Sequence, residues 1–292
     1  MKRNSKNSIV KKLCLGSAQF GLNYGVNNLR GKIPEEEVFD ILNYAVNNGI
    51  EFIDTAYDYG DSEKVIGRFI RSSDKGKQLK VVSKLPKREN VYEILTETLN
   101  NLGIKKLYGY LVHNFDFFLR NPDIWQIFLK LKNEGKVEKI GFSLYYPEEY
   151  YKIENFKFDV LQIPFNIFDQ RFSNLLALFK KKGIEVFARS VFLQGLVFKN
   201  PNELCGKFSK LKEKLFYINS LSEKFKIPLS AIFLNFVVIN ENIDKVVIGV
   251  DNLANLKTNI DNLKFQNVIR KLYPQLLELK EIDEDIVVPT RW

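Results

Sequence analysis

The sequence is poor in the residues that build metal sites and disulfide frameworks. Its 292 residues include one histidine, His113, and two cysteines, Cys14 and Cys205. Two cysteines so far apart exclude a disulfide framework and a thiolate metal site, and this usage is typical of a reducing cytoplasm. No acidic residues stand at a recognised metal-binding spacing from His113, so we predict no metal and a cytoplasmic protein.

The sequence also lacks a long apolar run and a concentrated block of charge. The most apolar stretch, residues 229–239, contains Ser230 and Asn235 and is too short to span a bilayer. Residues 1–6 are basic but no apolar segment follows them, so we expect neither a secretory signal nor a membrane partner. The formal net charge of +9 is spread along the chain. This spread favours a solvated lysine-rich surface over a nucleic-acid partner.

What the sequence does contain is a repeat of a short apolar run, a loop and an amphipathic stretch. Such units are typical of parallel strands alternating with helices. Eight units without a linker predict an α/β protein, a single (β/α)8 TIM barrel over residues 1–292, with a C-terminal helical extension and a tail from Asp283. A doubly wound open sheet is the alternative, but residues 16–21 do not match G-x-G-x-x-G. The expected strands are residues 12–16, 51–54, 80–84, 107–112, 138–142, 159–163, 185–189 and, after a long insertion, 245–249.

Four polar residues close three consecutive apolar runs. Asp54 and Tyr59 follow the second run, Lys84 ends the third and His113 ends the fourth. The carboxyl ends of parallel strands share one edge, and chemistry is done at that edge in α/β proteins. We therefore expect a carboxylate, a phenol, an ammonium and an imidazole around one cavity.

This combination suits the protonation of an oxygen. A phenol has a pKa near 10 and donates poorly at neutral pH unless a cation stabilises its phenolate. Lys84 could supply that charge while Asp54 holds the ammonium, and His113 could orient a carbonyl beside Tyr59. Tyr59 could then protonate the oxygen as a hydride reaches the neighbouring carbon.

These residues resemble the catalytic tetrad of the aldo-keto reductases. The family pattern Asp-Thr-Ala-x-x-Tyr-Gly is present at residues 54–60, and the resemblance covers nearly the whole chain. It implies a TIM barrel and NAD(P)H-dependent reduction of a small aldehyde or ketone to an alcohol, or the reverse reaction. It assigns Tyr59 as the general acid or base, assisted by Lys84, Asp54 and His113.

The resemblance also implies a set of cofactor contacts. Ser143 and Gln162 match the positions that hold the nicotinamide carboxamide, and Arg189 stands where an aromatic residue usually stacks on the ring. A guanidinium can lie flat against a ring, but it adds a positive charge there. The other implied contacts are Gly16, Ser17, Ser190, Phe192, Gln194, Gly249, Asn252, Thr258 and Asn259.

The cofactor is NADP or NAD, with NADP slightly favoured by the resemblance. The basic residues that many members use for the 2′-phosphate are missing, because Asp251, Asn252 and Asn255 occupy that region.

Two other functions remain open at this point. A cofactor-binding regulatory subunit without significant turnover is one, although the complete tetrad weighs against it. A Schiff-base lyase using Lys84 is the other, and Asp54 disfavours it because a paired carboxylate keeps lysine charged and less nucleophilic. Aromatic residues just past the strand ends could line a substrate pocket, namely Tyr57, Phe115, Tyr145 and Phe192.

Overall fold

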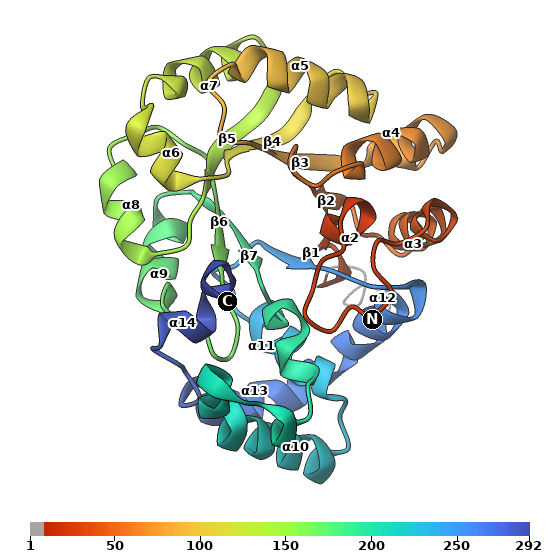
Figure 1. Ribbon diagram of the computed structural model, residues 1–292, viewed down its shortest axis with the longest axis vertical. Helices are drawn as coiled ribbons and strands as arrows, with labels where there is room; N and C mark the ends of the chain where they lie inside the picture. The colour runs from red at the N-terminus through yellow and green to blue at the C-terminus, as the bar shows by residue number, and fades with distance from the viewer. Residues whose placement is uncertain (1–8) are drawn as a thin grey trace.

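The structure is a computed structural model that describes residues 9–292, so the basic residues 1–6 lie outside the described part. Eight parallel strands pair in chain order and β8 pairs with β1, which closes the barrel (Figure 1). The predicted TIM barrel is confirmed. The strands are β1 Leu13–Gly16, β2 Phe52–Asp54, β3 Lys80–Leu85, β4 Leu107–Val112, β5 Val137–Ser143, β6 Val160–Pro164, β7 Glu185–Arg189 and β8 Lys245–Ile248.

Helices surround the barrel on all sides (Figure 1). The α-helices are α2 Ala18–Gly21, α3 Glu35–Asn47, α4 Ser62–Ser72, α5 Val91–Leu102, α6 Phe115–Arg120, α7 Ile124–Asn133, α8 Pro147–Ile153, α9 Ser173–Lys181, α10 Lys212–Phe225, α11 Leu229–Val238, α12 Leu253–Asn262, α13 Gln266–Leu277 and α14 Glu284–Val287. Short 3-10 helices lie at η1 Gly76–Gln78, η2 Leu193–Phe198, η3 Pro201–Glu203, η4 Gly206–Leu211, η5 Leu263–Phe265 and η6 Pro289–Arg291.

The strands are continuous apolar runs because both of their faces are covered. All six residues of β4 are buried, as expected for a parallel strand between a barrel interior and a helical layer. One cluster of side chains fills the barrel interior, and a larger one packs between the strands and the helices. The interior cluster consists of Cys14, Phe52, Val82, Tyr108, Leu111, Val160, Phe187 and Val247.

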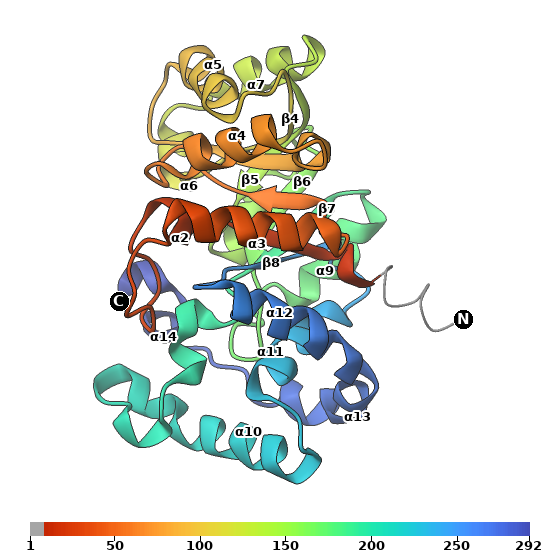
Figure 2. The same cartoon turned by 90° about the vertical axis from the view of Figure 1, so that its right-hand side faces the viewer.

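Two elements near the strand C-terminal ends differ from the sequence prediction. Helix α6 begins two residues after His113, and Asn114 caps it by accepting a 2.8 Å hydrogen bond from the Phe117 amide. The tail from Asp283 also folds, and α14 buries Ile286 and Val287 completely. Figure 2 shows α14 and the C-terminus at the same end of the barrel as α6. Within residues 9–292, no helix is long and apolar enough to cross a membrane.

A close approach between β5 and β6 sets two polar side chains next to each other. Gly141 pairs with Val160, and two residues further on Ser143 pairs with Gln162. A Cβ added at Gly141 would lie 1.7 Å from the Val160 carbonyl oxygen, so the backbone approach requires glycine.

We expect Gly141→Ala to destabilise the protein by about 2 kcal/mol or more, because backbone atoms must move to relieve the clash. Gly109→Ala is a matched control in neighbouring β4, where the added carbon meets only the Val82 side chain, with its two methyls at 3.2 and 3.3 Å. Urea unfolding of both variants tests this. Equal losses of unfolding free energy would contradict the role given to the β5–β6 approach.

Candidate active site

The barrel brings the four predicted catalytic residues to one edge. Asp54 ends β2, Lys84 is the penultimate residue of β3, and His113 directly follows β4. Tyr59 lies in the turn between β2 and α4. These strands are neighbours in the barrel, so their C-terminal ends face one opening.

A buried ion pair joins Lys84 and Asp54. The Lys84 Nζ donates to both Asp54 carboxylate oxygens at 2.9 and 2.8 Å and to the Thr55 carbonyl oxygen at 2.7 Å. Gln162 Nε2 donates a fourth bond, 2.7 Å long, to Asp54 Oδ1. The side chains of Lys84 and Asp54 are 1% and 6% exposed. The ammonium therefore uses all three N–H donors, and the pair is held in one geometry.

Tyr59 and His113 lie in front of this pair. Their ring centroids are 6.0 Å apart with the planes at 79°, and Lys84 Nζ is 5.1 Å from the Tyr59 ring centroid. Both rings line the cavity described below, whereas Lys84 does not. A phenol and an imidazole are thus presented together to a ligand, with the charged pair behind them.

The electrostatics of Tyr59 differ from the sequence expectation. Burial raises the pKa of Tyr59 well above 10, Asp54 raises it further, and Arg189 acts in the opposite direction. Lys84 was expected to make the phenol acidic, but Asp54 offsets its charge at close range. Tyr59 therefore stays protonated at neutral pH, which is the form that a proton donor requires.

His113 is held in its neutral form. Burial lowers the pKa of His113 to about 3, and the positive charges of Lys84 and Arg189 add to this effect. A neutral imidazole has one N–H donor and one acceptor nitrogen. His113 can therefore hydrogen-bond an oxygen without carrying a charge at physiological pH.

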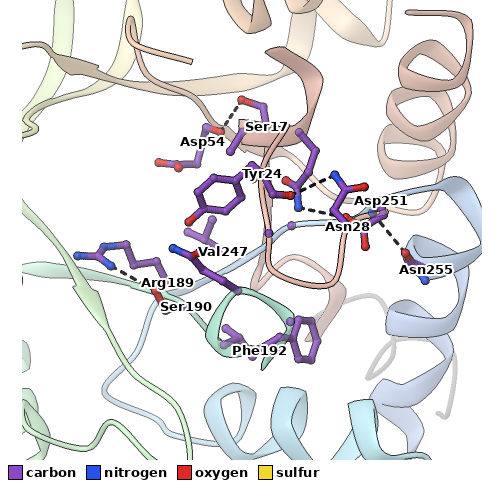
Figure 3. Close-up of a pocket in the computed structure, with 18 of the residues that line it drawn as sticks. Ser17, Tyr24, Asn28, Asp54, Arg189, Ser190, Phe192, Val247, Asp251 and Asn255 are labelled. Atoms are coloured by element: carbon purple, nitrogen blue, oxygen red, sulfur yellow. Dashed lines mark hydrogen bonds between the residues drawn. The ribbon is translucent and has the colours of Figure 1, made fainter. Parts of the chain in front are cut away.

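A cavity of about 440 Å³ opens beside these residues, within the size range of small-molecule and cofactor sites. Figure 3 shows it running from Asp54 and Arg189 to Asp251 and Asn255, with Tyr24 between them. The structure places eleven of the twelve predicted cofactor residues in its lining, namely Gly16, Ser17, Ser143, Gln162, Arg189, Ser190, Phe192, Gln194, Gly249, Thr258 and Asn259.

The twelfth residue, Asn252, has another role. Its side chain accepts a 2.8 Å hydrogen bond from the Asn255 amide and caps α12, and it does not line the cavity. Among the aromatic residues considered for a substrate pocket, Tyr145 and Phe192 line the cavity. Tyr57 instead donates to Glu97, and Phe115 packs on Phe118 and Phe142.

The sequence interpretation missed the loop between α2 and α3. Tyr24, Asn27 and Asn28 line the cavity, and the Val26 amide donates to the Gln194 carbonyl oxygen at 3.0 Å. Across the opening, Arg30 donates to the Asp251 carbonyl oxygen at 3.3 Å. A glycine- and asparagine-rich segment after the first strand was the available signal, because such loops bind ligands in barrel proteins.

Several groups in the lining could hold a dinucleotide. Ser143 and Gln162 supply a hydroxyl and an amide at the catalytic end. Ser190, Leu193 and Gln194 all have positive φ angles, and such strained backbone is typical of segments that contact ligands. Within residues 9–292, no three histidine, cysteine or acidic side chains gather as a metal site.

A family model described as "Aldo/keto reductase family" matches residues 12–276. The chain therefore belongs to the aldo/keto reductase family of oxidoreductases, as its catalytic motif indicated.

Individual relatives are distant. The oxidoreductase YqkF of Bacillus subtilis, described as uncharacterized, is 22% identical over 280 residues, covering 86% of this chain and 90% of YqkF. The aryl-alcohol dehydrogenase GME11368 of Pestalotiopsis microspora is 22% identical over 296 residues, covering 88% of this chain and 76% of the dehydrogenase. The solved aldo-keto reductase AKR11C1 of Bacillus halodurans, in its holo form, aligns with a TM-score of 0.73 and 17% identity over 94% of both chains. That likeness shows the shared fold.

Because the folded pKa of His113 is lowered, the unfolded state binds more protons between the two values. The contribution of His113 to the free energy of unfolding should therefore rise with pH from about 3 to about 6.5. His113→Gln removes this titrating imidazole. The slope of unfolding free energy against pH should therefore be smaller in the variant than in the wild type, by up to about 1.4 kcal/mol per pH unit. Urea unfolding from pH 4 to pH 7 measures both slopes. No other histidine is present to mask the effect, and parallel curves would contradict a neutral buried imidazole.

Proposed function

We propose that the protein is an NAD(P)H-dependent reductase of aldehydes or ketones, with Tyr59 as the general acid. When bound, the nicotinamide cofactor supplies the hydride. Tyr59 gives its proton to the substrate oxygen, and in the reverse direction takes it from an alcohol. His113 orients that oxygen by a hydrogen bond, while Lys84 and Asp54 fix the ends of β2 and β3 around them.

The observation that carries the proposal is the pairing of a protonated phenol and a neutral imidazole on the wall of one cavity. The raised pKa of Tyr59 keeps its proton in place, and the lowered pKa of His113 keeps the imidazole uncharged. Both groups can therefore hydrogen-bond the same carbonyl oxygen. Such a polar pair stabilises charge that develops on that oxygen during reduction.

Gln162 and Ser143 are suited to hold the nicotinamide carboxamide. Gln162 Nε2 is used by Asp54, which orients the amide and leaves Oε1 as its acceptor. Ser143 lies beside it across the β5–β6 pair and can donate or accept. Together they match a carboxamide, which has both donors and an acceptor.

The state of Lys84 does not favour the Schiff-base alternative. A lysine nucleophile must be neutral and must reach the substrate. Lys84 is 1% exposed, is paired with Asp54 and lies outside the cavity lining. The regulatory-subunit alternative has no feature of this site in its favour, because all four tetrad positions are filled by the residues that catalysis uses.

The far end of the cavity favours NAD over NADP, in contrast to the general leaning of the family. Asp251 lines that end, together with the neutral side chains of Asn255, Thr258 and Asn259. No lysine or arginine lines it within the described chain, and Arg30, which donates to the Asp251 carbonyl oxygen, is paired with Glu37 at 2.8 Å. A 2′-phosphate would meet a carboxylate, whereas a ribose hydroxyl could donate to it.

Tyr59→Phe should lower the rate of carbonyl reduction by about 10²–10⁴-fold, because the proton donor is lost. Fluorescence titration should show that the variant still binds reduced cofactor. Tyr57→Phe is the matched control, since its hydroxyl bonds Glu97 away from the cavity and its rate should be near that of the wild type. Turnover by Tyr59→Phe at the wild-type rate would refute Tyr59 as the acid.

Asp251→Asn should raise the affinity for NADPH relative to NADH by about tenfold, because it removes the charge nearest to a 2′-phosphate. Burial raises the pKa of Asp251, so the titrations belong at pH 8, where the wild-type carboxylate is ionised. Asp74→Asn makes the same change in net charge at an exposed site. An unchanged NADPH-to-NADH ratio in Asp251→Asn would remove this residue from cofactor selection.

A further inference from the structure

Arg189 places a positive charge at the catalytic end of the cavity, and a carboxylate that senses it, Glu149, accepts hydrogen bonds from the Tyr145 and Tyr146 amides instead. It ends β7 and lines the cavity near Tyr59 and His113. Among residues 9–292, no carboxylate lies within 4.0 Å of its guanidinium to form an ion pair. The other charges in the lining are Asp54, which Lys84 neutralises, and Asp251 at the opposite end.

The guanidinium is held in a fixed position. Its Nη2 donates to the Leu144 carbonyl oxygen at 3.1 Å, and Nη1 donates to Ser190 Oγ at 3.2 Å. Its central carbon lies 4.1 Å from the centroid of the Tyr145 ring. A planar cation with two hydrogen bonds and a stacked ring loses little freedom when a ligand arrives.

The charge acts on the groups around it. Arg189 opposes the rise in the pKa of Tyr59 that burial causes, and it reinforces the lowering of the pKa of His113. A ligand at this end of the cavity is therefore exposed to the same field. In a partly dehydrated site, a fixed charge discriminates strongly between a neutral and a cationic ligand.

We propose that Arg189 makes the site discriminate against oxidised nicotinamide cofactor, so that the protein works as a reductase. The oxidised nicotinamide ring carries a positive charge and the reduced ring is neutral. A cation that no carboxylate contacts at the nicotinamide end disfavours the oxidised form alone. The inference rests on the proposed function, because it requires the nicotinamide to bind at the Tyr59 end of this cavity.

The test compares three ligands, NADH, NAD⁺ and ADP-ribose, by fluorescence and calorimetric titration of the wild type, Arg189→Gln and Arg189→Lys. ADP-ribose has the pyrophosphate but no nicotinamide ring, so it reports any contact of Arg189 with phosphate. We expect Arg189→Gln to improve NAD⁺ binding relative to NADH by about tenfold or more and to leave ADP-ribose binding nearly unchanged. Arg189→Lys keeps the charge and should keep the wild-type ratio.

Three results would overturn the inference. An unchanged NAD⁺-to-NADH ratio in Arg189→Gln would show that the charge does not act on the ring. An equal loss of affinity for all three ligands would make Arg189 a pyrophosphate contact. A ratio shifted as much by Arg189→Lys as by Arg189→Gln would assign the effect to stacking. Arg189→Met is a second neutral variant should the glutamine variant not fold.

Failure of the proposed function gives a separate result. In that case wild-type protein binds neither NADH nor NADPH, whereas the outcomes above all require bound dinucleotide.

Discussion

The buried ion pair between Lys84 and Asp54 is the interaction on which the rest of the site depends. Two charges in a dry interior are tolerated only when their geometry and hydrogen bonds are nearly complete. Here the Thr55 carbonyl oxygen and the Gln162 amide complete the set. The pair therefore connects β2, β3 and β6 near their C-terminal ends. The register of these strands determines the position of the side chains that line the cavity.

The same pair explains the charge distribution in front of it. Burial is the largest cause of the pKa shifts of Tyr59 and His113, Asp54 adds to the first shift and Lys84 adds to the second, and both groups remain uncharged. Arg189 is then the one charged group in the lining at this end of the cavity that has no ion-pair partner among residues 9–292. Tyr59 and His113 are neutral and Arg189 is a fixed cation, so the affinity of this end of the cavity for a ligand depends on the charge of that ligand.

The sequence was sufficient for features that depend on local pattern. The apolar run at residues 107–112 has the observed bounds of β4, because the burial pattern of a strand depends on the local sequence. The grouping of the tetrad also followed, since the parallel order fixes which strand ends meet. Features set by distant contacts were missed. The loop with Val26 depends on Gln194, and α14 depends on a core far away in the chain.

Residue types alone could not predict whether the pKa of Tyr59 is raised or lowered. A neighbouring ammonium lowers the pKa of a phenol only when its charge is not already offset, and the offset by Asp54 is a matter of distances. The proposed reduction does not require an acidic phenol. An alkoxide is a stronger base than a phenolate, so proton transfer becomes favourable when negative charge develops on the substrate oxygen. In the proposed mechanism, a tyrosine whose pKa is raised keeps its proton until that moment, and the Lys84 ammonium lies 5.1 Å from the centroid of its ring.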